Sequence, residues 1–423
     1  MADIYQQIWN ADQQTNGIQP ILDNEAGDAD AGYVKVNADL VADSDPDLKV
    51  LPEVVIPDNK QDSYHLVRKL FNNYALPEAA REVDTPEERT ERHAFLSAIF
   101  DAPPMRIARD YIGDRTGDAN MSDERWHNVL MDHWFRTFES GGDPELSGFE
   151  HVLVGEQEGG KVQGYHFWYK YWLDDGFARA VDGGLDTVPG LSDDRIVYTG
   201  AKQGDRQLKF PESVTIAYKW NAPDYDANAV RPLHKKIGGF FVGCSAECLM
   251  ALGTVRAHIG ANAPKIAVIE GASYQMKVFR SPNNRHIRTF YPVFKGAADP
   301  VTDQPLPGGG NGPVTGSVRI LAALVNPISH DPGKEAVTLV NTGATPIDAA
   351  NWMIRDRNEK TEVLASAQLL PGVPHSFILT GDGAQLSNKG GKIRLLDPNG
   401  KTVHSVSYSR AQARAENQTL IFT

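Results

Sequence analysis

The sequence predicts an α+β protein in three consecutive parts: a mainly helical region, a region of antiparallel strands, and an all-β sandwich at the end. Three observations lead to this prediction. Apolar residues in about the first 145 positions recur at spacings of three and four, the period of an amphipathic helix. Between about residues 146 and 296 they form short runs of β-type composition instead. After a stretch rich in proline and glycine, short alternating segments are separated by turn residues, as an antiparallel sandwich requires.

Three segments of the first region carry helical signals. Residues 63–75 and 123–140 space their apolar side chains at three and four, and we interpret their aromatic residues as core. Residues 84–102 open with Asp-Thr-Pro followed by acidic residues, which is a helix start signal. We therefore expect a helix in each segment.

The second region is rich in β-branched and aromatic residues. We expect strands at 213–220, 265–280 and 287–294, and one helix at 245–259, where "SAECLMALGTVRAHI" interrupts the β-type pattern. Together with the helical part, this region makes one domain of residues 1–296.

A linker is expected at residues 297–315, because "AADPVTDQPLPGGGNGPVT" has the proline and glycine content of an interdomain connection. The last domain, residues 316–423, contains alternating segments separated by Pro, Gly and Asn-Gly turns. We expect strands in the segments 335–341, 351–356, 375–381 and 391–409.

Composition limits the possible partners. The chain has 423 residues and a net charge of −13, which argues against gripping long polyanions through diffuse positive charge but leaves a small nucleic-acid site open. No apolar run approaches the ~20 residues of a membrane helix, and the start lacks the basic and apolar segments of a secretory signal. We therefore expect no membrane span and a cytoplasmic location.

The stretch "FEHVLVGEQEGGKVQGYHFW", residues 149–168, places two histidines on either side of a Gly-Gly pair. We expect His151 on a strand, a turn at Gly159-Gly160, and a helix that begins near His166, so that the two rings come together. The helix N-terminus would lower the pKa of His166, and a neighbouring glutamate would raise that of His151. Two imidazoles with separated pKa values form a general acid–base pair.

The residues alone leave other interpretations open. Most histidines are packed or exposed rather than catalytic, and we assign His127 and His133, which lie among helix aromatics, to that class. Metal ligation by His151 and His166 with the nearby glutamates is a second possibility, although their spacing is no known zinc pattern.

The segment "SGFEHVLVGEQEGGKVQGYHFWYKYWL" closely resembles the signature of the EndoU family, the XendoU-type poly(U)-specific endoribonucleases. The likeness extends through "IWNADQQ", "PEERTERHAFLSAIFD", "GGFFVGCSAE" and "RTFYPVF", and covers most of residues 5–295. It implies an antiparallel-sheet catalytic region that cleaves single-stranded RNA at uridylates by attack of the 2′-hydroxyl. The products would carry 2′,3′-cyclic phosphate and 5′-hydroxyl ends.

The resemblance also implies roles for individual residues. His151 and His166 match the two catalytic histidines, and Lys235 matches the catalytic lysine by its distance from the "GGFF" element. Lys236 and the Arg231-Pro232 pair remain alternatives for that position. Glu150 and Glu156 match two acidic positions that position the histidines or interact with a metal.

Three further residues match the substrate-binding positions of the family. Ser245, Thr289 and Tyr291 correspond to residues that hold the uracil and the phosphate region, although Ala246 stands where the family commonly has proline. Ser245 is also a plausible cap of the following helix, and Tyr291 a plausible core aromatic. Relatives often respond to manganese, so the resemblance implies Mn²⁺ as a possible aid that the chemical step does not require.

The last domain resembles the lamin tail domain, an immunoglobulin-like β-sandwich. Val325-Asn326-Pro327, Glu335, Asn341 and Trp352 fall where that family has comparable residues. The resemblance implies a binding or anchoring module whose ligand is unknown.

Two other functions remain open for the whole chain: a catalytically weak RNA-binding protein of the same fold, and a metal-dependent hydrolase that uses the glutamates and histidines.

Overall fold

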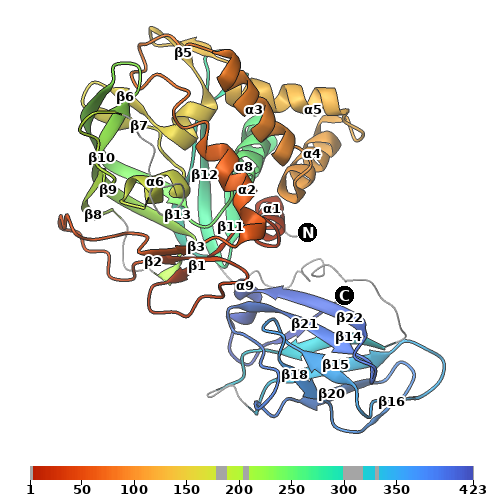
Figure 1. The fold of residues 1–423 in the computed structure, drawn as a ribbon. Helices are drawn as coiled ribbons and strands as arrows, with labels where there is room; N and C mark the ends of the chain where they lie inside the picture. The colour runs from red at the N-terminus through yellow and green to blue at the C-terminus, as the bar shows by residue number, and fades with distance from the viewer. Residues whose placement is uncertain (1–2, 178–187, 203–208, 299–317, 329–332, 423) are drawn as a thin grey trace. The chain divides into compact units, whose positions relative to one another are not determined.

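The computed structural model describes residues 3–177, 188–202, 209–298, 318–328 and 333–422 (Figure 1). The chain divides into two compact units, one of residues 3–298 and one that begins at Asp299. Most of the predicted linker, from residue 299 on, lies outside the described residues. Within the described residues, no helix is both long and apolar enough to cross a bilayer.

The first half of the first unit contains the predicted helices. Its helices are α1 (Ile4–Gln13), α2 (Gln61–Arg68), α3 (Pro86–Ile99), α4 (Pro103–Thr116) and α5 (Asp123–Leu130). Thr85 caps α3 in a reciprocal capping box with Glu88, which confirms the start signal in the sequence. The segments 63–75 and 123–140 are helical only in part, because α2 ends at Arg68 and α5 passes into a π-helical turn over Met131–Phe135.

The description of this region as mainly helical missed several short strands. These are β1 (Gln19–Leu22), β2 (Tyr33–Val36) and β3 (Glu53–Val55), which form one sheet, and the hairpin of β4 (Phe138–Ser140) and β5 (Asp143–Leu146). Each has only three or four residues, too few for an alternating pattern to stand out from the surrounding acidic sequence.

Two antiparallel-rich sheets form the second half of the unit. The five-stranded sheet has the order β6-β7-β10-β9-β8, and the three-stranded sheet has the order β11-β12-β13. Their strands are β6 (Glu156–Glu158), β7 (Lys161–Gln163), β8 (Ile196–Ala201), β9 (Ser213–Asp224), β10 (Ala229–Phe241), β11 (Ile266–Ile269), β12 (Ala272–Arg280) and β13 (Ile287–Ala297). The strands expected at 213–220, 265–280 and 287–294 are confirmed.

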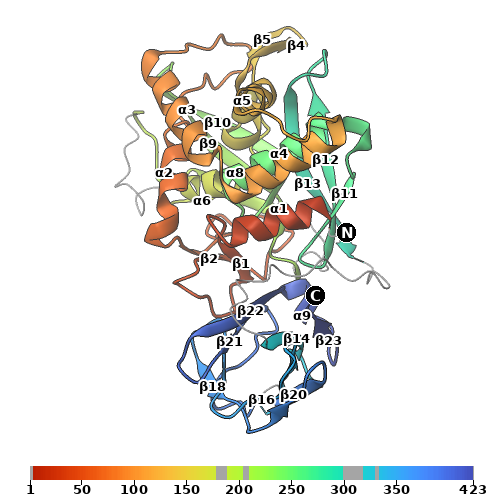
Figure 2. The ribbon, with the colours of Figure 1, turned by 90° about the vertical axis from the view of Figure 1, so that its right-hand side faces the viewer.

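The predicted helix at 245–259 is α8 (Ala246–His258), and it lies at the centre of the unit. Figure 2 shows α8 beside α1 and α4, and it also contacts β12 and β13 of the three-stranded sheet. Nearly all its side chains are buried, as expected of a helix that is covered on every side.

The second unit is the predicted all-β sandwich. One sheet has the order β20-β15-β14-β23 and the other β18-β17-β21-β22, all paired antiparallel, with one apolar core for the unit. The elements are β14 (Val318–Leu324), β15 (Ala336–Asn341), β16 (Ile347–Asp348), β17 (Met353–Arg355), β18 (Thr361–Val363), β19 (Gln368–Leu369), β20 (Pro374–Ile378), β21 (Gly390–Leu396), β22 (Thr402–Ser409), α9 (Arg410–Ala413) and β23 (Thr419–Ile421).

Two of the residues matched to the lamin tail domain have structural roles. Glu335 is buried, and its carboxylate accepts a hydrogen bond from the backbone N–H of Leu386 at 2.8 Å. Asn341 is fully buried and donates to the carbonyl oxygens of Thr345 and Leu369. Both side chains therefore satisfy backbone groups inside the sandwich.

Candidate active site

A tight hairpin carries the first histidine toward the second. Strands β6 and β7 pair antiparallel with Glu158 opposite Lys161, and Gly159 takes a positive φ of 59° in the turn between them. This confirms the turn predicted at Gly159-Gly160.

The histidines themselves are held in irregular backbone. His151 lies in a π-helical turn over Glu150–Val154, not in the strand that we expected. All five residues of this turn are buried, so the sequence contained no real alternation between a buried and an exposed face. Helix α6 (Trp168–Asp174) begins two residues after His166, close to the predicted start.

Backbone hydrogen bonds bring the two segments together. The N–H of His166 donates to the carbonyl of Val152 at 2.7 Å, and the N–H of Tyr165 donates to the carbonyl of His151 at 2.8 Å. Gly164 makes this approach possible, because a Cβ atom there would lie 1.7 Å from the His151 carbonyl oxygen. The two histidines are therefore fixed as neighbours by the main chain.

The ring of His166 has two defined contacts. Its Nδ1 lies 2.8 Å from the carbonyl oxygen of Gly239, which can only accept, so Nδ1 carries the proton in the neutral ring. The ring also stacks on Tyr291, with centroids 4.7 Å apart and an interplanar angle of 23°. Tyr291 therefore lies directly at the predicted site.

His151 is bound to a carboxylate instead. Its Nδ1 lies 3.1 Å from Oε2 of Glu156, which in turn contacts Nη1 of Arg288 at 3.1 Å. The other guanidinium nitrogen of Arg288, Nη2, donates to Oε1 of Glu78 at 2.8 Å. These contacts link His151, through Glu156 and Arg288, to Glu78, which is far away in the sequence.

Of the three candidate cations, Lys235 is the one whose charge contributes to the lowered pKa of both His151 and His166. Its Nζ donates to the carbonyls of Val162 and Gly164, at 3.2 and 2.7 Å, and burial lowers its pKa to about 8. By contrast, Lys236 is exposed, and Arg231 pairs with Asp224 at 2.9 Å.

The electrostatics of the two histidines differ from the expectation. Burial, followed by the positive charges of Arg288 and Lys235, lowers the pKa of His151 well below its usual value. Burial, followed by Lys235 and His151, does the same to the pKa of His166. The prediction of oppositely shifted pKa values is therefore wrong, because desolvation of both rings outweighs the nearby glutamates.

The two supporting glutamates are buried acids. Burial, reinforced by the charge of Glu156, raises the pKa of Glu150 well above its usual value. Burial also raises the pKa of Glu156, which Arg288 opposes. Of these two side chains, it is Glu156 that contacts a catalytic candidate among the described residues, His151.

Ser245 has a capping role in the structure. It is fully buried, its Oγ donates to Asp12 at 2.5 Å, and it accepts from the N–H of Cys248 as the N-cap of α8. The hydroxyl is thus used within the protein, and we leave Ser245 out of the substrate site proposed below.

Thr289 and Tyr291 follow a bulge in β13. The register pairs Arg280 with Ile287 but Phe279 with Thr289, so Arg288 is an extra residue without a cross-strand partner. In a regular strand, residues 288 and 291 would point to opposite faces. The bulge re-aims the chain, and Tyr291 contacts His166 while Arg288 contacts Glu156, which holds His151. The Oγ1 of Thr289 is buried and has no hydrogen-bond partner among the described residues.

Three side chains form a group of the type that holds a metal ion. Glu78, His151 and Glu156 each offer a ligand atom, and these atoms lie within 4.8 Å of one another. In kind and spacing the group suits a divalent cation. However, Arg288 contacts both oxygens of Glu156 and one of Glu78, so a metal would have to compete with its guanidinium group.

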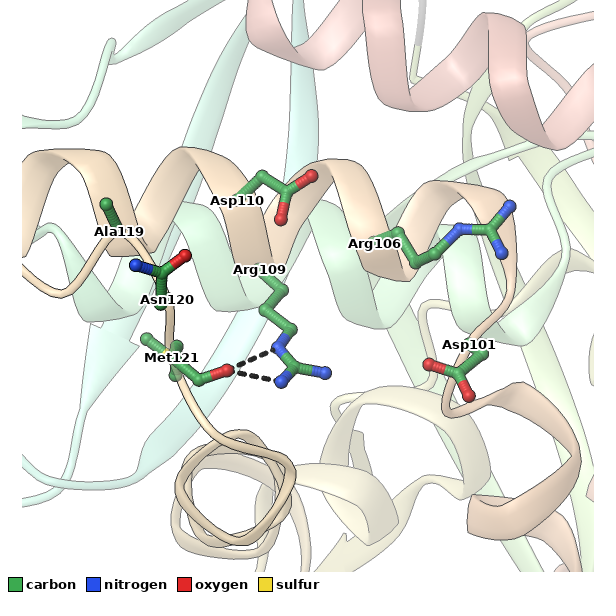
Figure 3. A pocket seen from close by; sticks show the side chains of 7 residues that line it. All are labelled: Asp101, Arg106, Arg109, Asp110, Ala119, Asn120 and Met121. Atoms are coloured by element: carbon green, nitrogen blue, oxygen red, sulfur yellow. Dashed lines mark hydrogen bonds between the residues drawn. The ribbon is translucent and has the colours of Figure 1, made fainter.

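A pocket on the surface of α4 is separate from these residues. Figure 3 shows Asp101, Arg106, Arg109, Asp110 and their neighbours around it, with Arg109 donating to the carbonyl of Met121. None of the residues predicted for the site lines this pocket. It therefore plays no part in the chemistry discussed below.

Two residues at the site were missed by the sequence analysis. Arg288 directly precedes Thr289 in the quoted "RTFYPVF" element, so its position was a usable signal. Glu78 is 73 positions before His151, in a loop with no pattern of its own, and nothing in the sequence connects the two.

Comparison with known proteins gives a consistent result. The profile of the XendoU family, described as Endoribonuclease XendoU, matches residues 1–292. A poly(U)-specific endoribonuclease of Xenopus tropicalis is 27% identical over 306 residues, which are 71% of this chain and 95% of that protein. A uridylate-specific endoribonuclease B of Danio rerio is 27% identical over 309 residues, with 69% and 95% covered.

The solved structure of XendoU, described as a splicing independent snoRNA processing endoribonuclease, has the same fold. It matches with a TM-score of 0.50 and 23% identity, over 70% of this chain and 97% of that one.

Proposed function

The chain belongs to the XendoU endoribonuclease family, and we propose that it cleaves single-stranded RNA at uridylates by attack of the 2′-hydroxyl on the adjacent phosphate. The products carry a 2′,3′-cyclic phosphate and a 5′-hydroxyl. The observation that carries this proposal is the unequal pair of histidines beside a lysine: His166 is bound to a neutral carbonyl, and His151 to a carboxylate.

His166 acts as the general base. The Gly239 carbonyl holds the proton on Nδ1, so the neutral ring presents a lone pair on Nε2. The lowered pKa keeps this ring neutral near pH 7, which is the form a base requires. Nε2 takes the proton of the 2′-hydroxyl as O2′ forms its bond to phosphorus.

His151 acts as the general acid. Burial lowers the pKa of His151, so the free protein favours the neutral ring. We propose that the phosphodiester anion, together with the Glu156 carboxylate on Nδ1, raises this pKa when the substrate binds, so that the ring enters the reaction as imidazolium. Nε2 gives its proton to O5′ while the bond between phosphorus and O5′ breaks. The proton taken by one ring is thus balanced by the proton given by the other.

Lys235 stabilises the negative charge that develops on the phosphate oxygens. An ammonium group has three N–H donors, and the carbonyls of Val162 and Gly164 accept from two of them. The third remains for the substrate. Because these carbonyls fix the position of Nζ before the substrate binds, little reorganisation is needed during the reaction.

Tyr291 and Thr289 provide the substrate contacts beside the histidines. The Tyr291 ring already stacks on His166 and offers a surface for the base or ribose. The buried hydroxyl of Thr289, which has no hydrogen-bond partner among the described residues, would bond to the nucleotide once substrate binding exposes it. Recognition of uracil through these two side chains is part of the proposal.

No step of this mechanism uses a metal ion. We expect cleavage to proceed in EDTA, and any effect of added Mn²⁺ to act on RNA binding and not on the chemical step. A metal-dependent hydrolase using the same glutamates and histidines would instead lose activity in EDTA.

One assay tests the proposal. Purified full-length protein is incubated with a uridine-containing RNA, the matching deoxyoligonucleotide and a uridine-free RNA, and the new ends are identified by mass. We expect cleavage of the first substrate only, with cyclic phosphate ends. Cleavage of the DNA, or 3′-hydroxyl ends, would exclude attack by the 2′-hydroxyl. Binding of the RNA without cleavage would favour an RNA-binding protein of this fold.

We propose that the second unit is a lamin-tail-like accessory module, joined by the linker at 297–315, that binds or anchors a ligand of unknown class. Its support is the sandwich fold and the structural use of Glu335 and Asn341, two of the residues that carry the resemblance. A pull-down would test this proposal, with a cleavage-dead variant of the full-length protein as one bait and the same variant without residues 316–423 as the other. A ligand of the second unit would be captured by the first bait only, whereas RNA substrate would be captured by both.

A further inference from the structure

The group of Glu78, His151 and Glu156 has the composition of a metal site, yet it already contains a cation. Arg288 enters it from β13 and contacts three carboxylate oxygens at 2.8 to 3.4 Å. His151 contacts one of the same oxygens, Oε2 of Glu156, at 3.1 Å. The ligand atoms that would face a metal ion are therefore already used.

We propose that the guanidinium group of Arg288 takes the place of a divalent cation in this group, and that the protein binds no metal ion there unless this arginine is removed. The proposal concerns metal binding and does not depend on the proposed cleavage reaction.

Charge balance supports this role. Two carboxyl groups and an imidazole are buried together, and Glu156 is fully inaccessible. Buried carboxylates need a positive charge and hydrogen-bond donors nearby, because desolvation otherwise disfavours the ionised form. Arg288 supplies both, and a second cation in the same place would be repelled by the first.

Geometry supports it as well. A guanidinium group presents its N–H donors in a planar fork, and here the two terminal nitrogens each bind a different carboxyl group. A metal ion would also coordinate several oxygens, but it could dissociate from the protein. Arg288 is covalently part of the chain, and the bulge in β13 holds it in position.

The test measures metal binding directly. Full-length wild-type protein and the variant Arg288→Gln, which removes the charge but keeps an N–H donor, are titrated with MnCl₂, and free Mn²⁺ is followed by electron paramagnetic resonance. We expect the variant to bind one Mn²⁺ at least tenfold more tightly than the wild type. Adding Glu78→Gln to the variant should abolish this site.

A matched control is Arg285→Gln. Arg285 is an exposed arginine in the turn between β12 and β13. It pairs with Asp132 at 3.2 Å and not with Glu78 or Glu156. This variant should bind Mn²⁺ no better than the wild type, so a gain in both variants would indicate a general charge effect and overturn the proposal.

Two other results would also overturn it. One is a folded Arg288→Gln protein, judged by its circular dichroism spectrum, that binds Mn²⁺ no more tightly than wild type. The other is a wild-type protein that binds one Mn²⁺ and loses it on Glu78→Gln alone. The latter measurement does not need the Arg288 variant, so the proposal remains testable even if that variant does not fold.

Discussion

The described part of the first unit contains two pairs of neighbouring histidines, and one of them has the contacts that we expect of a catalyst. His151 and His166 are 5% and 6% exposed. His133 is likewise 5% exposed, and its Nε2 lies 3.1 Å from Nδ1 of His258. Burial is the main cause of the lowered pKa in all four residues. Neither burial nor a perturbed pKa therefore distinguishes the pairs.

The difference lies in what each ring nitrogen binds. In the first pair, each Nδ1 is bound to a separate acceptor, Glu156 or Gly239, so both rings keep Nε2 for another molecule. In the second pair, the rings of His133 and His258 bind each other, and the other nitrogen of His133, Nδ1, is buried without a partner among the described residues. A perturbed histidine thus indicates an active site only when an outside acceptor fixes one nitrogen and the other nitrogen can reach a second molecule.

The largest expected effect is on cleavage by the first pair. His151→Ala and His166→Ala should each lower kcat/KM for a uridine-containing oligonucleotide by ~10³-fold or more, within the range for loss of a general acid or base. His258→Ala, the matched change in the second pair, should alter kcat/KM by less than about threefold, as catalysis does not involve that ring. Equal losses from both pairs would remove the distinction drawn here.

Lys235 adds the charge that we propose for the first pair. Lys235→Ala should lower kcat by ~10²-fold or more, whereas the exposed neighbour change Lys236→Ala should have little effect. Since burial lowers the pKa of Lys235 to about 8, the ammonium form is lost as the pH rises through that value. We therefore expect kcat/KM to fall above about pH 8, and Lys235→Arg to move this fall to higher pH. An unchanged alkaline limb in Lys235→Arg would assign it to another group.

The second pair should affect the stability of the folded protein and not RNA cleavage. Burial lowers the pKa of His133 to about 3, from an unfolded value near 6.5, so the folded state favours the neutral ring. Its stabilising contribution is present above pH ~6.5 and is lost as the pH falls toward about 3, by up to ~1.4 kcal/mol per pH unit.

His133→Gln should make the free energy of unfolding, measured in urea between pH 4 and pH 7, less dependent on pH. The control is His127→Gln, a change at an exposed histidine of the preceding helix. If both variants keep the wild-type slope, the acid sensitivity comes from other groups.

The smallest expected effect concerns the second unit. Removal of residues 299–423 should leave kcat/KM on a short uridine-containing oligonucleotide within about twofold of the full-length value, as the catalytic contacts described above all lie within residues 78–291. A loss as large as that of His166→Ala would mean that the unit contributes directly to the reaction.

Much of the fold followed from local patterns. The helix start at Asp84-Thr85-Pro86, the cap at Ser245 and the Gly-Gly turn are set by residues a few positions apart, so local sequence was enough to predict them. The short strands β1 to β3 and the π-helical turn at His151 were not, because tertiary packing imposes them on segments with weak preferences of their own.

The sequence by itself determined which side chains we propose for the reaction, because motif positions pointed to His151, His166 and Tyr291 and to Lys235 as one of three candidates for the cation. Tertiary structure alone decided their electrical environment: Glu78 and Arg288, 210 positions apart, meet at Glu156, and burial lowers both histidine pKa values. The physical reason is the distance in sequence over which each effect acts. Propensities and turns depend on neighbours along the chain, whereas desolvation and charge depend on every group nearby in space.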